Sequence, residues 1–329
     1  MKLFLSALSL SIGFAAAAGA QQSVLTVYTY DSFVAEWGPG PAVEAAFEET
    51  CGCDLQFVAA GDGAALLARI QLEGKRTDAD IVLGLDSNLT ARAAATGLLT
   101  PHNRHDEWDL PVRWDDPLFV PYDWGFFAFV YDETRTAEPP GSMEALARSD
   151  IRVVIQDPRS STPGLGLLLW VKHAYGERAK SIWQELADNV VTVTPGWSEA
   201  YGMFLDGHAE MVLSYTTSPA YHMIAEGDRT KRAAAFAEGH YMQVEVAARL
   251  AASDQPELAD MFLEFMAGDV FQGLIPTTNW MYPAKMPASG LPVEFGELVQ
   301  PSKALLYSSD DAASVRDVAL AEWLEALSQ

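Results

Sequence analysis

A run of three hydroxyl side chains at residues 160–162 offers the clearest binding chemistry in the sequence. It separates the β-branched run 151–155 from the apolar stretch 165–170, and Pro163 suits the first position of a helix. A strand that leads into a helix in this way presents hydroxyls and free backbone N–H groups at one point, where the helix dipole adds partial positive charge. Phosphate or another anion could bind there. The alternative is that a hydroxyl of this run only caps its own helix.

Other loops carry groups that would complement such an anion site. They supply a carboxylate, further hydroxyls and N–H groups, and flat aromatic faces, although each aromatic ring taken alone could also belong to the core. A ligand with an anionic end and a planar or cationic ring would suit this combination. The candidate ligand-binding residues are Tyr30, Asp62, Gly63, Ser161, Thr162, Trp197, Tyr215, Thr216, Thr217, Ser218, Tyr221 and Trp280.

Cysteine and histidine usage gives little sign of catalysis or of a metal site. The two cysteines, Cys51 and Cys53, form a C-G-C pattern, for which a disulfide is the default in an oxidising compartment and free thiols are the alternative. They have no nearby histidine and make a poor zinc site. The sequence lacks G-x-S-x-G and H-E-x-x-H motifs, and its six histidines lack metal-like spacing. We therefore expect no catalytic residues, no metal and no cofactor.

The net charge limits the possible partners of the protein, and the first twenty residues indicate its location. The chain has 329 residues and a formal net charge of −24, with lysine and arginine scattered along the chain, so we expect no binding to nucleic acid. Residues 1–20 contain Lys2, an apolar run and a terminal Ala-Gly-Ala, which is the pattern of a secretory signal peptide. We expect export to a bacterial periplasm and a monomeric protein.

The elements that position these loops alternate between strands and helices. Such alternation predicts parallel sheets covered by helices, and ligands bind such sheets beyond the carboxyl ends of the strands. Two long extended runs, 119–131 and 240–248, indicate crossovers between two lobes with a cleft between them. We expect an α/β protein with a signal peptide at 1–20, the first part of lobe 1 at 21–125, lobe 2 at 126–240, and a return to lobe 1 with C-terminal helices at 241–329.

The sequence resembles the periplasmic thiamine-binding proteins of bacterial ABC importers. The resemblance covers nearly the whole chain after the signal peptide and is weakest at 101–117 and after about residue 284. The motifs that carry it are VLTVYTYDSF, WGPGP, CGCDL, DADIVLGLD, QDPRSSTPGLGLLLW, GWSEAYG, VLSYTTSPAYH, EGHYMQVEVAAR and IPTTNWMYP.

This resemblance implies the two-lobed fold of type II periplasmic binding proteins, delivery to the permease subunit of an importer, and thiamine, thiamine monophosphate and thiamine pyrophosphate as ligands. It also implies that the family's ligand contacts fall on the candidate residues given above. The chemistry agrees, because aromatic faces favour the permanent thiazolium cation, Asp62 could meet the aminopyrimidine, and hydroxyl-rich loops could hold phosphates.

Two other hypotheses remain open at this point. A binding protein for another small anion, a chelated metal or a cationic solute would use the same fold. Thiaminase I enzymes also resemble this fold, but they use a cysteine in the cleft as nucleophile. Here both cysteines precede the second predicted strand, away from the strand ends, so we expect them to face the wrong way.

Overall fold

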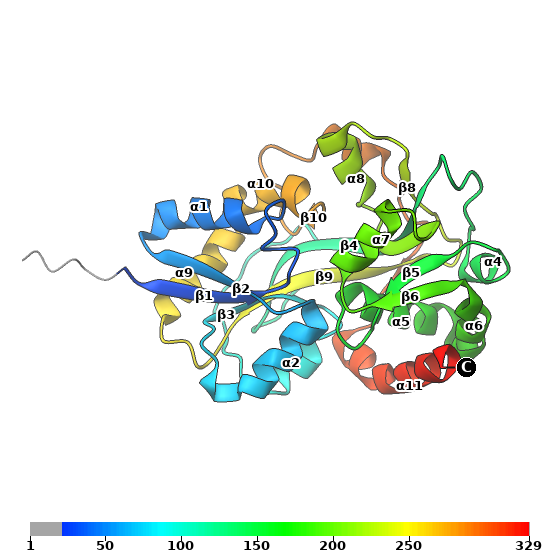
Figure 1. Ribbon diagram of the computed structural model, residues 1–329. Coiled ribbons are helices and arrows are strands. Elements are labelled where there is room, and N and C mark those ends of the chain that lie inside the picture. The colour runs from blue at the N-terminus through cyan, green and yellow to red at the C-terminus, as the bar shows by residue number, and fades with distance from the viewer. Residues whose placement is uncertain (1–21, 329) are drawn as a thin grey trace, which may run out of the picture.

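The computed structural model describes residues 22–328, and the predicted signal peptide lies outside this range. The strands form one mixed sheet in the order β2-β1-β3-β9-β4-β7-β5-β6. Two groups of helices surround the two halves of this sheet, which gives the molecule a two-lobed outline (Figure 1). Within residues 22–328, no helix combines the length and apolar character that crossing a membrane demands.

The first lobe is built on three parallel strands. β1 (Val24–Thr29) pairs with β2 (Asp54–Ala59) on one side and with β3 (Ile81–Asp86) on the other. All six residues of β3 are buried, as the continuous apolar run predicts for a strand that is covered on both faces. Helices on either side cover these strands (Figure 1): α1 (Gly40–Cys51), α2 (Gly63–Glu73), α9 (Pro256–Met266) and α10 (Asp269–Thr278). The short helix α3 (Thr90–Ala94) follows β3.

The second lobe repeats this arrangement. β5 (Val153–Gln156) pairs in parallel with β6 (Val190–Thr194) and with β7 (Met211–Tyr215). Residues 162–171 of α5 are all buried, because the helix is apolar nearly all round and has no solvent face there. The accompanying helices are α4 (Met143–Ala147), α5 (Thr162–Tyr175), α6 (Ala179–Leu186), α7 (Trp197–Leu205) and α8 (Pro219–Tyr221), which continues as a π-helical turn over His222–Glu226.

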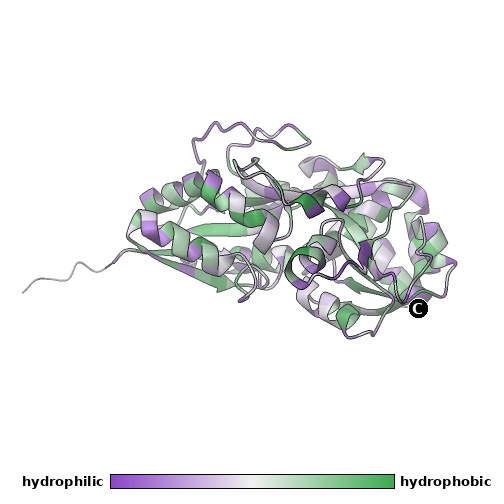
Figure 2. Ribbon diagram, turned by 90° about the horizontal axis from the view of Figure 1, so that it is seen from above, coloured by the Kyte–Doolittle hydropathy of each residue, from purple (hydrophilic) through white to green (hydrophobic). Residues whose placement is uncertain are grey.

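Two long strands run through both lobes, at the places where the sequence predicts crossovers. β4 (Val120–Asp132) pairs with β9 (His240–Arg249) up to Phe126 and with β7 from Phe127 onward. Both strands are antiparallel to their neighbours in the first lobe, so each lobe combines three parallel strands with antiparallel crossovers. The strands are largely hydrophobic, whereas the outer helices and loops carry hydrophilic residues (Figure 2).

Short elements and the last helix complete the chain. The final helix, α11 (Ser309–Leu327), packs mainly against α6 and α5. The division into lobes at residues 126 and 240 stays a proposal, and these contacts favour grouping α11 with the second lobe rather than with the return to lobe 1. The short elements are β8 (Lys231–Ala233), β10 (Tyr282–Pro283), β11 (Ala304–Leu305) and the 3₁₀ turns Gly74–Arg76, Gly176–Arg178, Ala187–Asn189 and Val293–Glu297.

Candidate functional site

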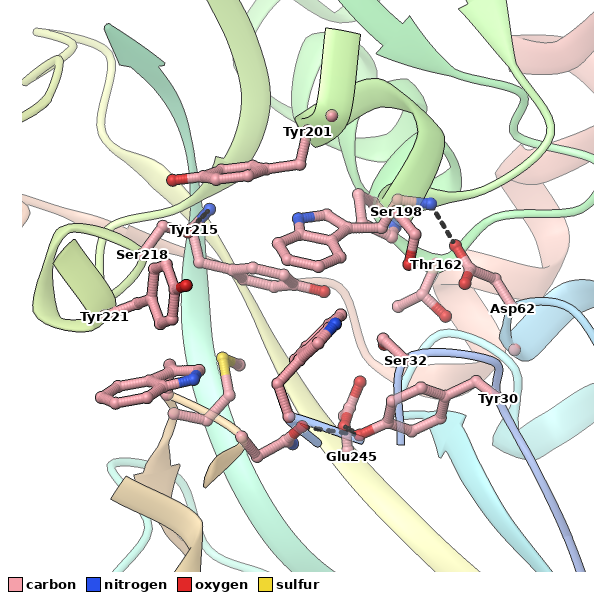
Figure 3. Close-up of a pocket in the computed structure, with 18 of the residues that line it drawn as sticks. Tyr30, Ser32, Asp62, Thr162, Ser198, Tyr201, Tyr215, Ser218, Tyr221 and Glu245 are labelled. Carbon is pink, nitrogen blue, oxygen red and sulfur yellow. Dashed lines mark hydrogen bonds between the residues drawn. The ribbon is translucent and has the colours of Figure 1, made fainter. Parts of the chain in front are cut away.

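A cavity of about 300 Å³ lies between the two lobes, where loops from both halves of the sheet meet (Figure 3). Nine of the twelve predicted ligand-binding residues line it, although they come from sequence positions more than two hundred residues apart. Their side chains give the cavity both aromatic faces and polar groups. These nine are Tyr30, Asp62, Gly63, Thr162, Trp197, Tyr215, Ser218, Tyr221 and Trp280.

The other three predicted residues lie behind the cavity wall. Ser161, Thr216 and Thr217 are fully buried and do not line the cavity. The Thr217 hydroxyl contacts the sulfur of Met281 at 3.5 Å, and the Thr216 hydroxyl has no partner among the described residues. The hydroxyl cluster at the end of β7 therefore presents Ser218 to the cavity and turns its two threonines inward.

Asp62 connects the two lobes across one end of the cavity. Its Oδ2 accepts a hydrogen bond from the Ser161 hydroxyl at 2.7 Å and another from the backbone N–H of Trp197 at 3.1 Å. Asp62 precedes α2 in the first lobe, whereas both donors begin helices of the second lobe. Burial raises the pKa of Asp62 to about 6, while these two hydrogen bonds act to lower it. The three groups form a latch between the lobes.

This latch changes the interpretation of Ser161. Ser161 occupies the N-cap position of α5, but its side chain makes no capping hydrogen bond to that helix. Its hydroxyl instead donates a hydrogen bond to Asp62, which lies 99 residues away in sequence. The free N–H groups at the start of α5 consequently remain available to a ligand beside Thr162, which lines the cavity.

Gly63 allows the two lobes to approach each other this closely. A β-carbon at Gly63 would lie 2.5 Å from the Thr162 hydroxyl and 2.7 Å from the carbonyl oxygen of Gly84. Both distances are well inside van der Waals contact, so any side chain here would force α2 and α5 apart. Gly63, which the sequence analysis gives as a candidate ligand contact, is therefore also required for the close packing of α2 against α5.

Stacking and hydrogen bonds to residues of the second lobe fix the orientation of the Trp197 ring in the cavity wall. The Trp197 ring stacks on Tyr201 with centroids 4.9 Å apart, and its Nε1 donates to the Ser214 hydroxyl at 2.8 Å. The Tyr201 hydroxyl in turn bonds His222 Nε2 at 2.9 Å, and His222 Nδ1 lies 2.7 Å from Glu226. This chain of contacts fixes the plane of the Trp197 ring.

Trp280 has an unusual backbone conformation. Its φ is +58°, a left-handed value that is uncommon for a bulky residue and costs free energy. Its ring packs edge-to-face on Tyr221 with centroids 5.3 Å apart, and its buried Nε1 has no partner among the described residues. Strain and an unpaired buried donor in a cavity-lining residue point to a binding role rather than to packing alone.

Several lining residues were not predicted from the sequence. Glu245 had a detectable signal, because a glutamate is out of place in the apolar run of β9. Trp37 and Asn279 stand in the quoted motifs WGPGP and IPTTNWMYP, but nothing local distinguishes them as contacts. The unpredicted lining residues are Ser32, Trp37, Pro163, Ser198, Tyr201, Gly202, Leu205, Glu245, Asn279 and Met281.

The disulfide and a cluster of His222, Glu226 and Asp228 lie outside the cavity lining. Cys51 and Cys53 are joined in a disulfide with their Cα atoms 5.1 Å apart, and neither lines the cavity. Among residues 22–328, His222, Glu226 and Asp228 come close enough to hold a metal ion. Asp228, however, pairs with Lys231 at 2.9 Å, and both nitrogens of His222 already bond protein groups.

Comparison with known proteins places the chain in a family. Residues 29–273 match the family model described as bacterial extracellular solute-binding protein. This chain belongs to the bacterial extracellular solute-binding proteins. A thiamine-binding periplasmic protein of Escherichia coli is 53% identical over 309 residues, which cover 93% of this chain and 94% of that protein. One of Brucella abortus is 51% identical over 97% of this chain and 96% of its own length.

Solved structures agree with this placement of the solute-binding protein. A structure titled periplasmic thiamin binding protein is 52% identical, with a TM-score of 0.91, covering 94% of this chain and 97% of that one. Iron-bound HitA of Pseudomonas aeruginosa has a TM-score of 0.72 at 20% identity over 90% of this chain and 99% of that one, which speaks for the fold alone. The predicted two-lobed type II fold is confirmed, and the protein is periplasmic, as its relatives are.

Proposed function

We propose that this solute-binding protein captures thiamine in the cavity between its lobes. The observation that carries the proposal is the composition of the cavity wall. Aromatic faces of Trp197, Tyr215, Tyr221 and Trp280 suit a planar cationic ring, and the start of α5, beside Asp62, suits an anionic or hydroxyl tail. Thiamine combines a thiazolium cation, an aminopyrimidine and a hydroxyethyl tail. The names of relatives that are about half identical support the same ligand.

Native mass spectrometry and calorimetry test this proposal. We expect thiamine to co-purify with the protein or, after refolding in its absence, to bind with a stoichiometry of one. Incubation with thiamine and a nucleophilic base should leave the vitamin intact, since the two cysteines are bonded to each other outside the cavity. A cleaved pyrimidine product would show an enzyme, and a lack of any thiamine binding would exclude the proposed ligand.

We extend the proposal to thiamine monophosphate and thiamine pyrophosphate, with their phosphates at the start of α5. Thr162→Ala should weaken the phosphorylated ligands about ten- to a hundredfold more than thiamine, because one charge-assisted hydrogen bond contributes about 1.5–3 kcal/mol. Ser161→Ala should instead weaken all three ligands alike, because its hydroxyl bonds Asp62.

Calorimetric titration with the three ligands measures this difference. Ser160→Ala is a matched control, because the Ser160 hydroxyl bonds the Pro195 carbonyl and does not line the cavity. Thr162→Ser should keep most of the preference for phosphorylated ligands. Equal weakening of all three ligands by Thr162→Ala would mean that this residue serves only the helix start or the lobe contact.

We further propose that the protein acts as a monomer and closes its lobes on the ligand. The closed protein then delivers the ligand to the permease subunit of an ABC importer. β4 and β9 are the strands that join the lobes, so a hinge movement would pass through them. The latch at Asp62 forms only when the lobes are together, which would let the permease distinguish a closed protein from an open one.

A further inference from the structure

Three carboxyl groups lie in one row beneath the cavity. The register of the sheet places Asp86 of β3 opposite Glu245 of β9, and Glu245 opposite Asp123 of β4. Residues directly opposite each other on neighbouring strands share a face of the sheet with their β-carbons about 5 Å apart. Asp86 and Asp123 are fully buried, and Glu245 is 6% exposed where it reaches the cavity beside Tyr30 (Figure 3).

These carboxyl groups have no positive partner among the residues that the structure describes. None of the ion pairs formed among residues 22–328 involves Asp86, Asp123 or Glu245. Asp86 is satisfied locally by the side chain and the backbone of Asn88. A buried carboxylate without a counter-charge is costly, so the remaining two groups need an explanation.

Neutral donors satisfy Glu245 but leave one oxygen of Asp123 without a partner. Glu245 accepts hydrogen bonds from the hydroxyls of Tyr122 at 2.6 Å and Tyr30 at 3.1 Å, and from the side-chain amide of Gln243 at 3.3 Å. Asp123 Oδ2 accepts one from Asn279, but its buried Oδ1 has no partner among the described residues. Asp123 also interacts directly with the Glu245 carboxyl group, so two acidic groups meet beneath the cavity without a cation beside them.

Burial raises the pKa values of the two carboxyl groups and of the hydroxyl groups that face them. Burial raises the pKa of Glu245 to about 7, and burial together with the charge of Glu245 raises the pKa of Asp123 well above its ordinary value. The hydroxyls that face the pair, those of Tyr30, Tyr122 and Tyr215, have raised pKa values through burial and stay neutral. Near neutral pH the pair therefore retains a proton that two separate, hydrated carboxyl groups would have lost.

We propose that the Asp123–Glu245 pair is the counter-charge that selects a cationic ligand, and that ligand binding displaces the proton which the pair shares. This inference rests on the proposed function, since thiamine carries a permanent cation in its thiazolium ring. The free pair holds one proton and one negative charge. When the cation binds, the proton leaves to solvent and both carboxylates become ionised beside it, so one positive charge replaces another.

The direction of the pH dependence follows from this exchange. A cation binds the doubly ionised pair more tightly, so affinity should rise with pH and level off above the pKa of the pair. Below the pKa values of the pair the affinity should fall by up to tenfold per pH unit for each proton that the ligand must displace. Burial raises the pKa values of Asp62 and Asp86 to about 6 each, below that of Glu245, so measurements between pH 6.5 and 8.5 report mainly on the pair.

Calorimetry at pH 7.0 in PIPES and in ACES, whose heats of ionisation differ, measures the protons released. For thiamine we expect between about 0.5 and 1 proton released per ligand. A neutral analogue, 3-deazathiamine, in which a thiophene replaces the thiazolium, should release none and should bind independently of pH. Thiamine binding without proton release, or equal release by both ligands, would overturn the inference. A protein that binds neither ligand would refute the proposed function instead.

Glu245→Gln tests the pair directly, since it keeps an acceptor for both tyrosine hydroxyls and removes the charge. Thiamine affinity at pH 8 should fall at least about tenfold, in keeping with desolvated cation contacts, and its pH dependence should disappear. The neutral analogue should bind the variant like the parent, which also shows that the cavity is intact.

Asp80→Asn is the matched control, because it removes another buried carboxylate beyond the opposite end of β3, where Asp80 bonds Thr26 and Ser253. It should leave proton release and pH dependence unchanged. An unaltered thiamine affinity in folded Glu245→Gln protein would contradict the proposal. If that variant does not fold, the proton release of the parent protein still decides the question.

Discussion

Replacing Trp197 or Trp280 with alanine is expected to weaken thiamine binding at least tenfold while the chain remains folded. Both rings line the cavity and both are only half-buried, so neither is a central core residue. A desolvated cation–π contact contributes about 2 kcal/mol, and about 1.4 kcal/mol corresponds to tenfold in affinity. Trp197 is held in place by Tyr201 and Ser214, so its aromatic face is already oriented for the ligand.

Calorimetry and intrinsic fluorescence test this expectation, with circular dichroism to confirm folding. Phenylalanine at either position should recover much of the affinity, because the ring face survives while the indole N–H is lost. Trp108→Ala is the matched control, since Trp108 is also half-buried but packs on the core of the first lobe outside the cavity. If both alanine variants bound thiamine as tightly as the parent, the two rings would belong to the core or to a docking surface.

Removing the Asp62 carboxylate is expected to weaken thiamine binding about ten- to a hundredfold, because a hydrogen bond to a charged group contributes about 1.5–3 kcal/mol. In Asp62→Ala the Ser161 hydroxyl and the Trp197 N–H lose their acceptor only in the closed protein, where both are shielded from water. The open protein keeps both groups hydrated. The substitution should therefore disfavour closure rather than unfold either lobe.

Small-angle scattering separates closure from affinity. The parent protein should show a smaller radius of gyration with thiamine than without it, and Asp62→Ala should need a much higher thiamine concentration for the same change. Asp31→Ala is the control, because Asp31 is exposed and its carboxylate accepts a bond from Gly61 within the same lobe. A parent profile that stays constant at saturation would argue against hinge closure.

Local sequence features predicted the elements that carry the site. The β-branched and aromatic runs at 119–131 and 240–248 correspond to β4 and β9, and the hydroxyl run at 160–162 precedes α5. The D-G pair at 62–63 likewise begins α2. These features depend on side-chain period, capping preference and backbone freedom, all of which act over a few neighbouring residues.

The partners of the polar side chains could not be predicted in the same way. Nothing near Ser161 in the sequence indicates that its hydroxyl bonds Asp62 rather than the α5 backbone. Thr216 and Thr217 have the same local surroundings as Ser218, yet only Ser218 faces the cavity. Which way each hydroxyl points is set by the path of the chain after β7 and by the neighbours that it meets there.

The sequence by itself determined the main strands and helices, the strand ends where a ligand could bind, and nine of the nineteen residues that line the cavity. Only the tertiary structure decided that Asp62 joins the lobes and that Glu245 and Asp123 meet beneath the cavity. The physical reason is that side-chain periodicity and helix capping act locally, whereas contacts between distant segments depend on strand register and on the approach of the lobes. Register pairs residues 122 positions apart in β4 and β9, and a one-residue shift would turn Glu245 to the other face of the sheet.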